Sequence, residues 1–492
     1  MNLLPVWLVL LPLFLALLTA LAGGWKTGVR ILLAGIGGAG YLTLSLIAAD
    51  MVRRHGPLIY FVGGWGAPLG IGLRLDEFAV IFQVVLGLGL AATLAFILRG
   101  RGYVAAELPL LFLLTAAAAG MLLADDLFNL FVFVELASVC SVALIALRRR
   151  GPQVTAGFNY LVFTALSSMI FLLALMIIYG ATGHLNMGYV AARIANMPPL
   201  LYTAAVAGIV TAFGTKIGLI PLHFWQPAAY AAAGCSRAGF LSGVVMKIHI
   251  CALLRLLWYP LDVMAQAPAL ATILLVLGSV NVIAGHCLAL AQNDLKRMLA
   301  FSSVAHVGYI LMGVGAGTVA GMIAGLYHVV NHFMMKTALF WSSRAMLAHA
   351  RSSDLRRLQG AATAAPAAFI GFFVAALAIV GAPPSGGFFS KWLIALAASE
   401  GRGLWPVLVI AAGTLISLAY YGRVFCYALR SSTQPAGVSG RGSVPPLLMA
   451  AGCLMAGLAG AWLLPWLERA AVALFTRTPP VVAVMLRLMS DS

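Results

Sequence analysis

Apolar segments of about 20 residues follow one another along the whole chain, separated by short polar loops. A continuous apolar segment of this length crosses a bilayer as an α-helix, whereas the strands of a membrane barrel alternate in polarity. Apolar residues make up 63% of the chain and Asp, Glu, Lys and Arg only 9%, against about 25% charged residues in a soluble domain. We therefore expect an all-α polytopic membrane protein, not a soluble enzyme, a nucleic-acid binder or a disordered chain.

The hydropathy pattern predicts fourteen membrane spans. They cover residues 3–22, 29–49, 76–98, 106–124, 127–147, 158–180, 201–220, 237–258, 267–290, 298–315, 318–341, 366–397, 404–427 and 445–466. No positive charge precedes the first of these segments, which favours a spanning helix there over a cleavable signal peptide. In segment 53–75, Pro and Gly residues alternate with apolar ones, which predicts a short hairpin on the membrane surface.

The loop charges predict the orientation. Of the thirty Lys and Arg residues, seventeen fall in one set of loops and nine in the other. The richer side is cytoplasmic by the positive-inside rule, and an even number of spans then places both termini outside. We expect the protein to lie in the inner (plasma) membrane of the cell. The net charge of +17 is spread over short loops, so it indicates no nucleic-acid partner.

The four remaining cations are lysines inside predicted spans: Lys216, Lys247, Lys336 and Lys391. A charge at the bilayer centre costs about 2.5–3.5 kcal/mol on insertion scales. A proton carrier must exist in two protonation states, which a desolvated lysine can do and an arginine cannot. The alternative is that these lysines extend to the surface or anchor helix pairs. Four of them together favour proton transfer.

Glu135 is the only carboxylate well inside a predicted span. Such a carboxylate is expensive in a membrane unless it is paired or neutral. We expect one of the four buried lysines to be its partner.

His328, His332 and Lys336 recur every four residues, so they share one face of a helix. His306 lies within the preceding predicted span. Polar groups one turn apart, with water between them, can pass protons. The alternatives are a structural hydrogen-bonding role and an HxxxH metal site, but no third ligand is evident, so no metal is expected.

Two predicted spans are interrupted beside a lysine. Pro221 follows Lys216 and removes a backbone hydrogen bond, which frees a carbonyl to attract a cation. Segment 381–387 precedes Lys391 and divides its span into two halves. Broken membrane helices are tolerated where they line a cavity or site, although a simple kink is the alternative.

The interrupted spans are the seventh and the twelfth, which run in opposite directions. This spacing predicts an inverted repeat of five helices, spans 4–8 against spans 9–13. We therefore divide the single integral membrane domain, residues 1–492, into peripheral spans at 1–105, a first repeat at 106–258, a second repeat at 267–427, and a last span with a C-terminal tail at 428–492.

Six cysteines are scattered through apolar segments, without a CxxC or CxxCH motif. We expect six buried, inert thiols and no cofactor in this chain. Any redox centre would belong to a partner.

Five stretches together resemble the antiporter-like, proton-translocating membrane subunits of the complex I superfamily. The stretches are Tyr60–Asp76 (YFVGGWGAPLGIGLRLD), Lys216–Pro227 (KIGLIPLHFWQP), Leu241–Lys247 (LSGVVMK), Asp294–His306 (DLKRMLAFSSVAH) and Pro383–Lys391 (PPSGGFFSK). The chain resembles in particular the D-type subunits of Mrp-type multisubunit Na⁺/H⁺ antiporters, and it is also similar to complex I N-type and membrane-bound hydrogenase subunits.

The resemblance implies a role for each buried polar residue. The implied roles are a gate at Glu135 and Lys216, a central proton site at Lys247, a hydrophilic axis through His306, His328, His332 and Lys336, and an outer connection at Lys391.

The expected function is proton translocation within a multisubunit membrane complex, beside other antiporter-like and small hydrophobic subunits in the lipid bilayer. The transported ions are protons and, in an Mrp-type antiporter, Na⁺ as well. Two alternatives stay open. One is a proton-pumping membrane protein that a redox arm drives, as in NADH:quinone oxidoreductase or a membrane-bound hydrogenase, which leaves the question of enzymatic activity open. The other is an ion-silent scaffold within the complex.

Overall fold

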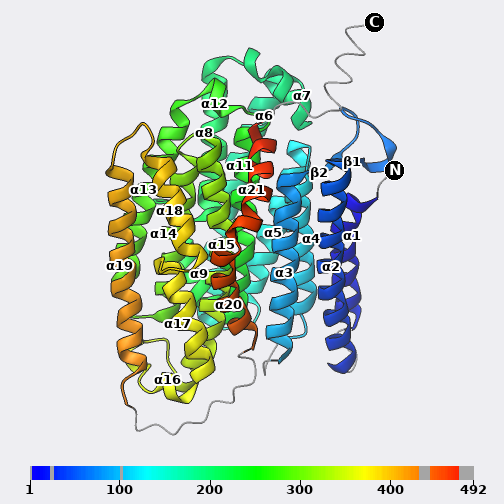
Figure 1. Cartoon of the computed structure of the whole chain (residues 1–492). Helices are drawn as coiled ribbons and strands as arrows, with labels where there is room; N and C mark the ends of the chain where they lie inside the picture. The colour runs from blue at the N-terminus through cyan, green and yellow to red at the C-terminus, as the bar shows by residue number, and fades with distance from the viewer. Residues whose placement is uncertain (1–2, 23–26, 100–103, 432–443, 476–492) are drawn as a thin grey trace, which may run out of the picture.

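The computed structural model describes residues 3–22, 27–99, 104–431 and 444–475 as a bundle of roughly parallel helices (Figure 1). The longer helices are α1 Leu4–Leu21, α2 Thr27–His55, α3 Glu77–Arg99, α4 Glu107–Leu123, α5 Leu127–Ala146, α6 Gly151–Thr182, α8 Pro199–Ile217, α13 Ala269–Leu290, α14 Leu295–Val314, α15 Val319–Ala350 and α19 Trp405–Ala428. The shorter ones are α7 Met187–Arg193, α9 Trp225–Ala233, α10 Cys235–Phe240, α11 Met246–Trp258, α12 Val263–Gln266, α16 Ala361–Ala364, α17 Pro366–Val380, α18 Gly386–Ser399, α20 Val444–Leu458 and α21 Gly460–Phe475.

Among the described residues, ten helices are long and apolar enough to cross a membrane, or eleven with α20 and α21 counted as one bent span. Three further elements complete the fourteen predicted spans. α4 and α17 are apolar but short, and α17 continues into α18 after a break. α15 has 32 residues, and its own histidines, asparagine and lysine lower its mean hydropathy. The prediction of an all-α polytopic membrane protein is confirmed.

A small antiparallel hairpin lies at one end of the bundle. Strand β1 (Leu58–Phe61) pairs with strand β2 (Gly72–Leu75), which confirms the hairpin predicted within 53–75. The first residues of α1 and the last residues of α21 lie at this same end (Figure 1). A chain that crosses the membrane an even number of times begins its first spanning helix and ends its last one on the same side.

Short polar side chains fix where several helices begin. Asp126 caps α5 by accepting hydrogen bonds of 2.9 Å from the backbone N–H groups of Phe128 and Asn129. Asp294 caps α14 in the same way through the N–H of Arg297 at 2.9 Å. These caps satisfy N–H groups that have no partner within the helix.

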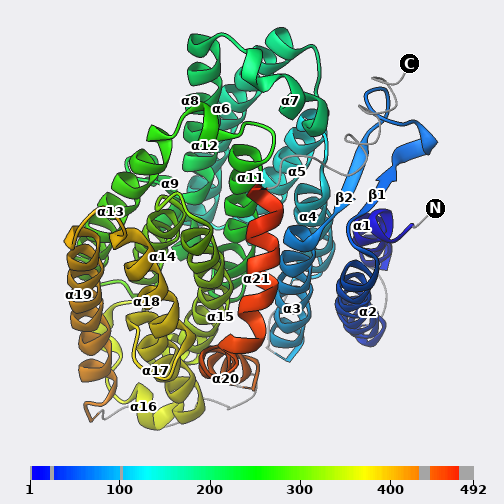
Figure 2. The same cartoon turned by 45° about the horizontal axis from the view of Figure 1, so that its top comes forward.

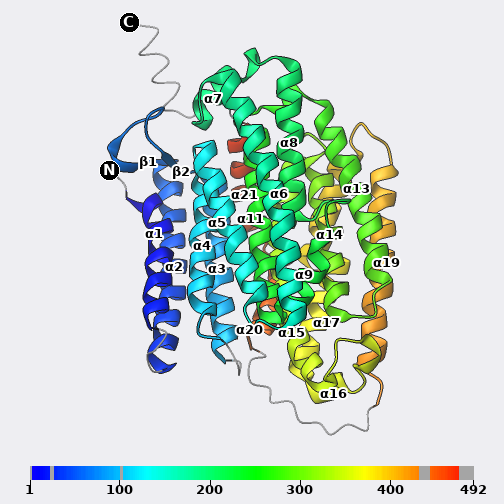
Figure 3. The ribbon, with the colours of Figure 1, turned by 180° about the vertical axis from the view of Figure 1, so that it is seen from behind.

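The same two caps reveal the internal symmetry. Asp126 forms an isolated antiparallel bridge with Asn186, and Asp294 forms one with Asp354. Asp126 and Asp294 each precede the second helix of a predicted repeat, α5 and α14. Their bridge partners, Asn186 and Asp354, each follow the third helix, α6 and α15. The segment after Asn186 leads to α7 at one end of the bundle, and the segment after Asp354 leads to α16 at the opposite end (Figure 3). Equivalent bridges at opposite ends are the expected consequence of an inverted repeat.

The seventh span is longer than the sequence predicted. The expected segment 201–220 ends with α8 at Ile217, but the chain continues through residues 218–224 into α9. The predicted end of this span at residue 220 is therefore too early, because α9 forms the second half of the broken span. Its alanine-rich sequence has few large apolar residues, so hydropathy alone does not mark it.

The last span also differs from the prediction. The segment expected as one span, 445–466, is two helices, α20 and α21, which bend by 80°. The backbone at Gly457, near the bend, packs so closely on Pro384 and Ser385 that no side chain would fit there. The bend thus lies against the break between α17 and α18. Residues 476–492 of the predicted tail lie outside the described residues.

Helices in the middle of the bundle are enclosed by the rest. Residues 237–258, from α10 through α11, are all buried, whereas only about a third of the residues in α1, α2 and α19 are buried (Figure 2). The exposure of the cysteine side chains follows the same difference between inner and outer helices. Cys287 on α13 and Cys426 on α19 are exposed, and Cys235 is half-buried. The expectation of six buried cysteines is therefore wrong for these three, and Cys287 and Cys426 lie on outward faces of outer helices.

Candidate functional site

Glu135 on α5 and Lys216 on α8 form an ion pair inside the bundle. The Lys216 Nζ lies 3.6 Å from the Glu135 Oε1. Ser168 of α6 connects them, because its hydroxyl donates to the carboxylate and accepts from the Lys216 ammonium at 3.1 Å. Lys216 also donates to the Ser138 hydroxyl at 2.9 Å. Glu135 thus has a buried lysine as its partner, as expected, and this lysine is the one that the family resemblance implied.

The break in span 7 places this lysine at a helix end. Lys216 is the penultimate residue of α8, and Gly218 ends the helix with φ 78°. A cation is stabilised near the C-terminal end of a helix dipole. The expectation that Lys216 binds a freed carbonyl is wrong, since its hydrogen bonds go to hydroxyl groups. The Trp225 indole instead donates to the Thr215 carbonyl in this turn, at 2.7 Å.

His249 on α11 is a site residue that the sequence analysis did not identify. Its Nδ1 contacts the Val245 carbonyl at 3.0 Å, and its buried Nε2 has no hydrogen-bond partner among the described residues. A small cavity of about 10 Å³, lined by Lys216, His249, Tyr160 and Tyr230 among others, lies between α8 and α11. It has room for about one water molecule. The available signal was the position of His249, two residues after Lys247.

Lys247 lies at the centre of the buried segment and is itself fully buried. It follows a π-helical stretch, Leu241–Val245, and its Nζ donates to the Ser242 carbonyl at 2.5 Å. The Ser242 hydroxyl pairs with the Ser303 hydroxyl of α14 at 2.8 Å. π-Helical turns occur frequently at functional sites. This turn links the two halves of the bundle through hydroxyl groups.

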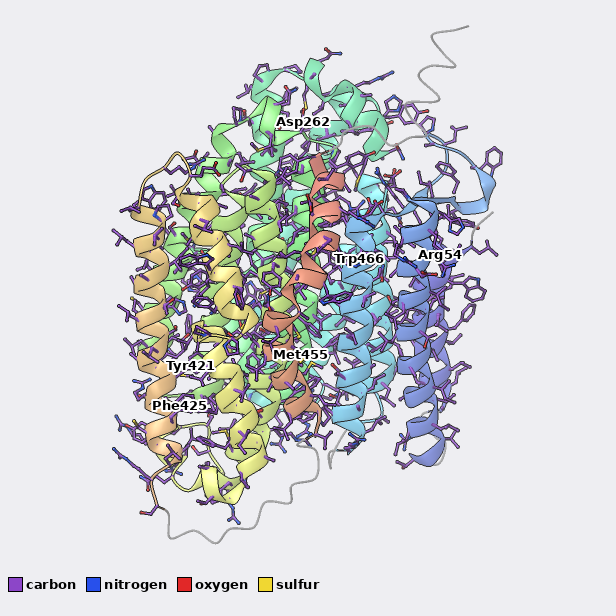
Figure 4. All side chains as sticks on the ribbon, viewed as in Figure 1. Arg54, Asp262, Tyr421, Phe425, Met455 and Trp466 are labelled. Atoms are coloured by element: carbon purple, nitrogen blue, oxygen red, sulfur yellow. The ribbon has the colours of Figure 1, made fainter. Side chains whose placement is uncertain are left out.

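Lys336 of α15 is buried against α14. Its Nζ donates to the Leu299 carbonyl at 2.9 Å and to the Ser302 hydroxyl. The Ser302 hydroxyl lies 3.3 Å from the Tyr421 hydroxyl. Tyr421, labelled in Figure 4, comes from α19. Lys336 therefore does not reach an interface, and hydroxyl groups from two other helices surround it.

The three predicted histidines form one cluster between α14 and α15. His306 Nδ1 lies 3.0 Å from His328 Nε2, and the ring centroids of His306 and His332 are 4.8 Å apart. The His328 Nδ1 continues to the Ser390 hydroxyl of α18 at 2.9 Å. Neither ring nitrogen of His332 has a hydrogen-bond partner in the described part of the chain, although both are buried. Buried nitrogens of this kind are expected to bond to water.

Lys391 spans the break in the twelfth span. It lies in the second turn of α18, and its Nζ donates to the Val380 carbonyl at the end of α17, at 2.9 Å. It lies 3.4 Å from the Thr414 hydroxyl and 4.6 Å from the centroid of the Tyr309 ring. Here a carbonyl at a helix break does bind a cation.

His286 extends the histidine cluster toward Lys391 and was also missed. Its ring lies 5.6 Å from that of His306, and its two nitrogens contact the hydroxyls of Tyr420 and Tyr309, each at 3.2 Å. The sequence signal was a histidine inside the ninth predicted span, near its end.

The eight predicted site residues thus lie along one buried path that crosses the helices of both repeats. Hydrogen bonds join Glu135 to Lys216 through Ser168, and join His306 through His328 to Ser390 next to Lys391. Within the described residues no direct hydrogen bond joins Lys247 to His332, but the two lie within electrostatic range. The path can therefore hold protons at separate stations, with water needed between some of them.

A second charged cluster lies at the hairpin end of the bundle, where its carboxylates Asp76 and Asp125 precede α3 and α5, and it holds the hairpin in place. Asp76 accepts two hydrogen bonds from Arg255, at 2.7 and 3.0 Å, and lies 3.2 Å from Arg74 Nε. Burial would raise the pKa of Asp76, but the two guanidinium groups hold it below its ordinary value. Burial raises the pKa of the neighbouring Asp125 to about 6, against the opposing effect of Arg74.

A family described as "NADH:quinone oxidoreductase/Mrp antiporter, TM" matches residues 124–417, which contain all eight of these site residues. The chain belongs to this family. The match spans both predicted repeats, including the two breaks.

Curated relatives agree with this family and with the resemblance of the motifs. The chain is 32% identical to the N-type subunit of an NADH-quinone oxidoreductase from Desulforudis audaxviator, with 90% of each chain covered. It is 30% identical to the D-type subunit of a Na⁺/H⁺ antiporter from Alkalihalophilus pseudofirmus, covering 80% of this chain and 81% of the relative.

The family fold is also seen in solved structures. A chain of the membrane-bound sulfane sulfur reductase, an archaeal respiratory membrane complex, superposes with a TM-score of 0.90 at 27% identity, covering 96% of this chain and 98% of that one. This family member therefore has the helix arrangement of a known respiratory membrane subunit.

Proposed function

We propose that the chain is a proton-translocating, antiporter-like subunit of a multisubunit membrane complex. The observation that carries the proposal is the path of four buried lysines, of which, among the described residues, only Lys216 forms an ion pair with a carboxylate, that of the partly exposed Glu135. Three unpaired ammonium groups are costly in such surroundings. Amines that gain and release protons in turn avoid that cost and supply a transport path.

In this mechanism the Glu135–Lys216 pair acts as the first switch. While the pair is closed, the carboxylate stabilises the proton on Lys216. When the pair opens, that proton passes through the small cavity toward His249 and on to Lys247. The neutral Lys216 amine then accepts the next proton. No bond other than N–H or O–H changes in these steps.

The second half of the path carries the proton outward. Lys247 is followed by Lys336 and by the cluster of His306, His328 and His332, and the Ser390 hydroxyl leads to Lys391. Each lysine disfavours protonation of its neighbours, since like charges repel in a medium of low dielectric constant. Successive protonations are therefore coupled along the row.

Glu135 supports the proposal of a partner subunit. Its side chain is 35% exposed although it lies in the middle of α5, on a surface where Phe128, Val132 and Val139 are exposed. A carboxylate facing lipid is unfavourable. We place another membrane subunit over this face of α5. The relatives named as subunits, and the similar chain of a respiratory membrane complex, support such an assembly.

The proposed location is the plasma membrane, with both termini outside. The end of the bundle opposite the hairpin carries the larger share of loop Lys and Arg residues, which favours the cytoplasmic side. We assign Na⁺ no site in this chain. The proposal includes no cofactor here, and any redox centre is assigned to a partner.

Transport by the assembled complex tests the proposal. Lys216→Ala and Glu135→Ala variants should assemble but change the internal pH of inverted membrane vesicles at rates below one-tenth of the wild type. Glu400→Ala, which removes an exposed carboxylate at the end of α18, is the control and should transport normally. Wild-type transport by either assembled axis variant would favour the ion-silent scaffold.

The energy source is decided by a separate measurement. The intact complex is purified from native membranes in mild detergent, and its optical and iron spectra are recorded. Flavin, iron–sulfur or nickel signals would assign the chain to a redox-driven pump. A colourless complex of hydrophobic chains would assign it to a gradient-driven cation/proton antiporter.

A further inference from the structure

A basic cavity lies at the end of the bundle opposite the hairpin, outside the lysine path. Its volume is about 360 Å³. Four cationic side chains line it, together with one carboxylate, Glu107. The cations are Arg148, Arg237, Lys296 and Arg344. The net charge of the lining is therefore +3.

Two of the lining cations are fixed in position by contacts within the chain. Arg237 is buried, donates to the Leu144 carbonyl at 2.9 Å, and lies 3.7 Å from the Glu107 carboxylate. Lys296 is half-buried and donates to the Ala231 carbonyl at 2.7 Å. The one carboxylate is thus directed at Arg237, and it compensates one of the four positive charges.

The two repeats share this cavity. Arg148 and Arg237 come from the first repeat, whereas Lys296 and Arg344 come from α14 and α15 of the second. The cavity also touches Ala232, in the last turn of α9, which is the second half of broken span 7. An occupant with several negative oxygen atoms would therefore join the repeats at the end of α9.

We propose that this cavity binds a phosphate group. Guanidinium and ammonium groups around one cavity are the chemistry that recognises phosphate oxygens. Its position at the ends of α3, α4, α6 and α14 is the level of the lipid headgroups, and basic pockets between membrane helices bind anionic headgroups. A membrane phospholipid is the source that this position favours, and a soluble phosphate is the other source with the same chemistry.

The test measures lipid retention by the assembled complex. The complex is placed in nanodiscs of phosphatidylcholine with added phosphatidylglycerol, and native mass spectrometry records the phosphatidylglycerol that remains bound. Lys296→Gln and Arg344→Gln should each weaken retention by about fivefold, and the double variant by more. Arg356→Gln and Arg357→Gln, exposed at the same end, are controls that should retain lipid normally.

A second experiment distinguishes a membrane phospholipid from a soluble phosphate and controls for misfolding of the variants. Lys296→Arg keeps the charge and should restore retention, which a loss of folding would not allow. In phosphatidylcholine alone, inorganic phosphate is titrated while thermal stability is followed. Stabilisation by phosphate without phosphatidylglycerol retention would assign the site to a soluble phosphate. If neither probe depends on Lys296 and Arg344, the proposal is wrong.

Discussion

Lys391 donates a 2.9 Å hydrogen bond to the Val380 carbonyl, and this contact closes the gap between the two halves of span 12. Gly381 ends α17 in the left-handed conformation, and its N–H closes on the Leu377 and Ala378 carbonyls, so the Val380 carbonyl lies beyond the last hydrogen bond of the helix. An ammonium group at this position therefore stabilises the break and also ends the row of buried amines. One residue serves the fold and the proposed path together.

Substitution of Lys391 separates these two roles. Lys391→Arg keeps a cation that can bind the Val380 carbonyl, but an arginine does not release its proton. The variant should assemble at wild-type levels on native gels and transport protons at least tenfold more slowly in inverted vesicles. Lys391→Ala should lose transport and some stability. Normal transport by Lys391→Arg would contradict a proton-carrying role for this residue.

Ser168 should adjust the strength of the Glu135–Lys216 pair. Ser168→Ala removes the hydroxyl between the two charges, and hydrogen bonds to charged groups are worth about 1.5–3 kcal/mol. We expect transport to fall by about tenfold without loss of assembly. Thr155→Ala, an exposed hydroxyl on the same helix, should have no effect. An unchanged rate for Ser168→Ala would show that this hydrogen bond does not control the gate.

His249 should connect Lys216 to Lys247. His249→Phe fills a similar volume but removes both ring nitrogens beside the small cavity. Transport should drop severalfold, and a solvent deuterium isotope effect should increase because this proton transfer becomes limiting. His55→Phe changes an exposed histidine at the end of α2 and serves as control. Equal rates and isotope effects in both variants would remove His249 from the path.

Asp125 should make the complex less stable as pH rises. Its pKa in the folded chain is about 6, above the ordinary value of 3.8, so the folded state holds this proton more tightly than the unfolded state. Its stabilising contribution is complete below pH 4 and is lost as pH rises through about 6. Asp125→Asn should therefore raise the free energy of unfolding at pH 8 by up to about 3 kcal/mol, which a higher melting temperature would report, and should change it little at pH 4. An equal shift at both pH values would contradict this linkage. Asp50→Asn, at an exposed carboxylate, is the control.

Much of the candidate site could be predicted from the sequence. A lysine or a glutamate within an apolar segment is conspicuous without any structure, and so is a proline or glycine break beside it. His249 and His286 were missed because a lone histidine in an apolar segment is ambiguous. Only their neighbours in space, the Lys216 cavity for one and Tyr309 and Tyr420 for the other, give them a place on the path.

The sequence by itself determined the class of the protein, because a bilayer imposes a length and a polarity on each helix. It also determined that four lysines would be buried and that spans 7 and 12 would be broken. Only the tertiary structure decided how these parts meet. Ser168 lies between Glu135 and Lys216, α9 completes span 7, and four cations from both repeats surround one cavity. These contacts join residues far apart in the chain, and local hydropathy carries no information about which helices pack together.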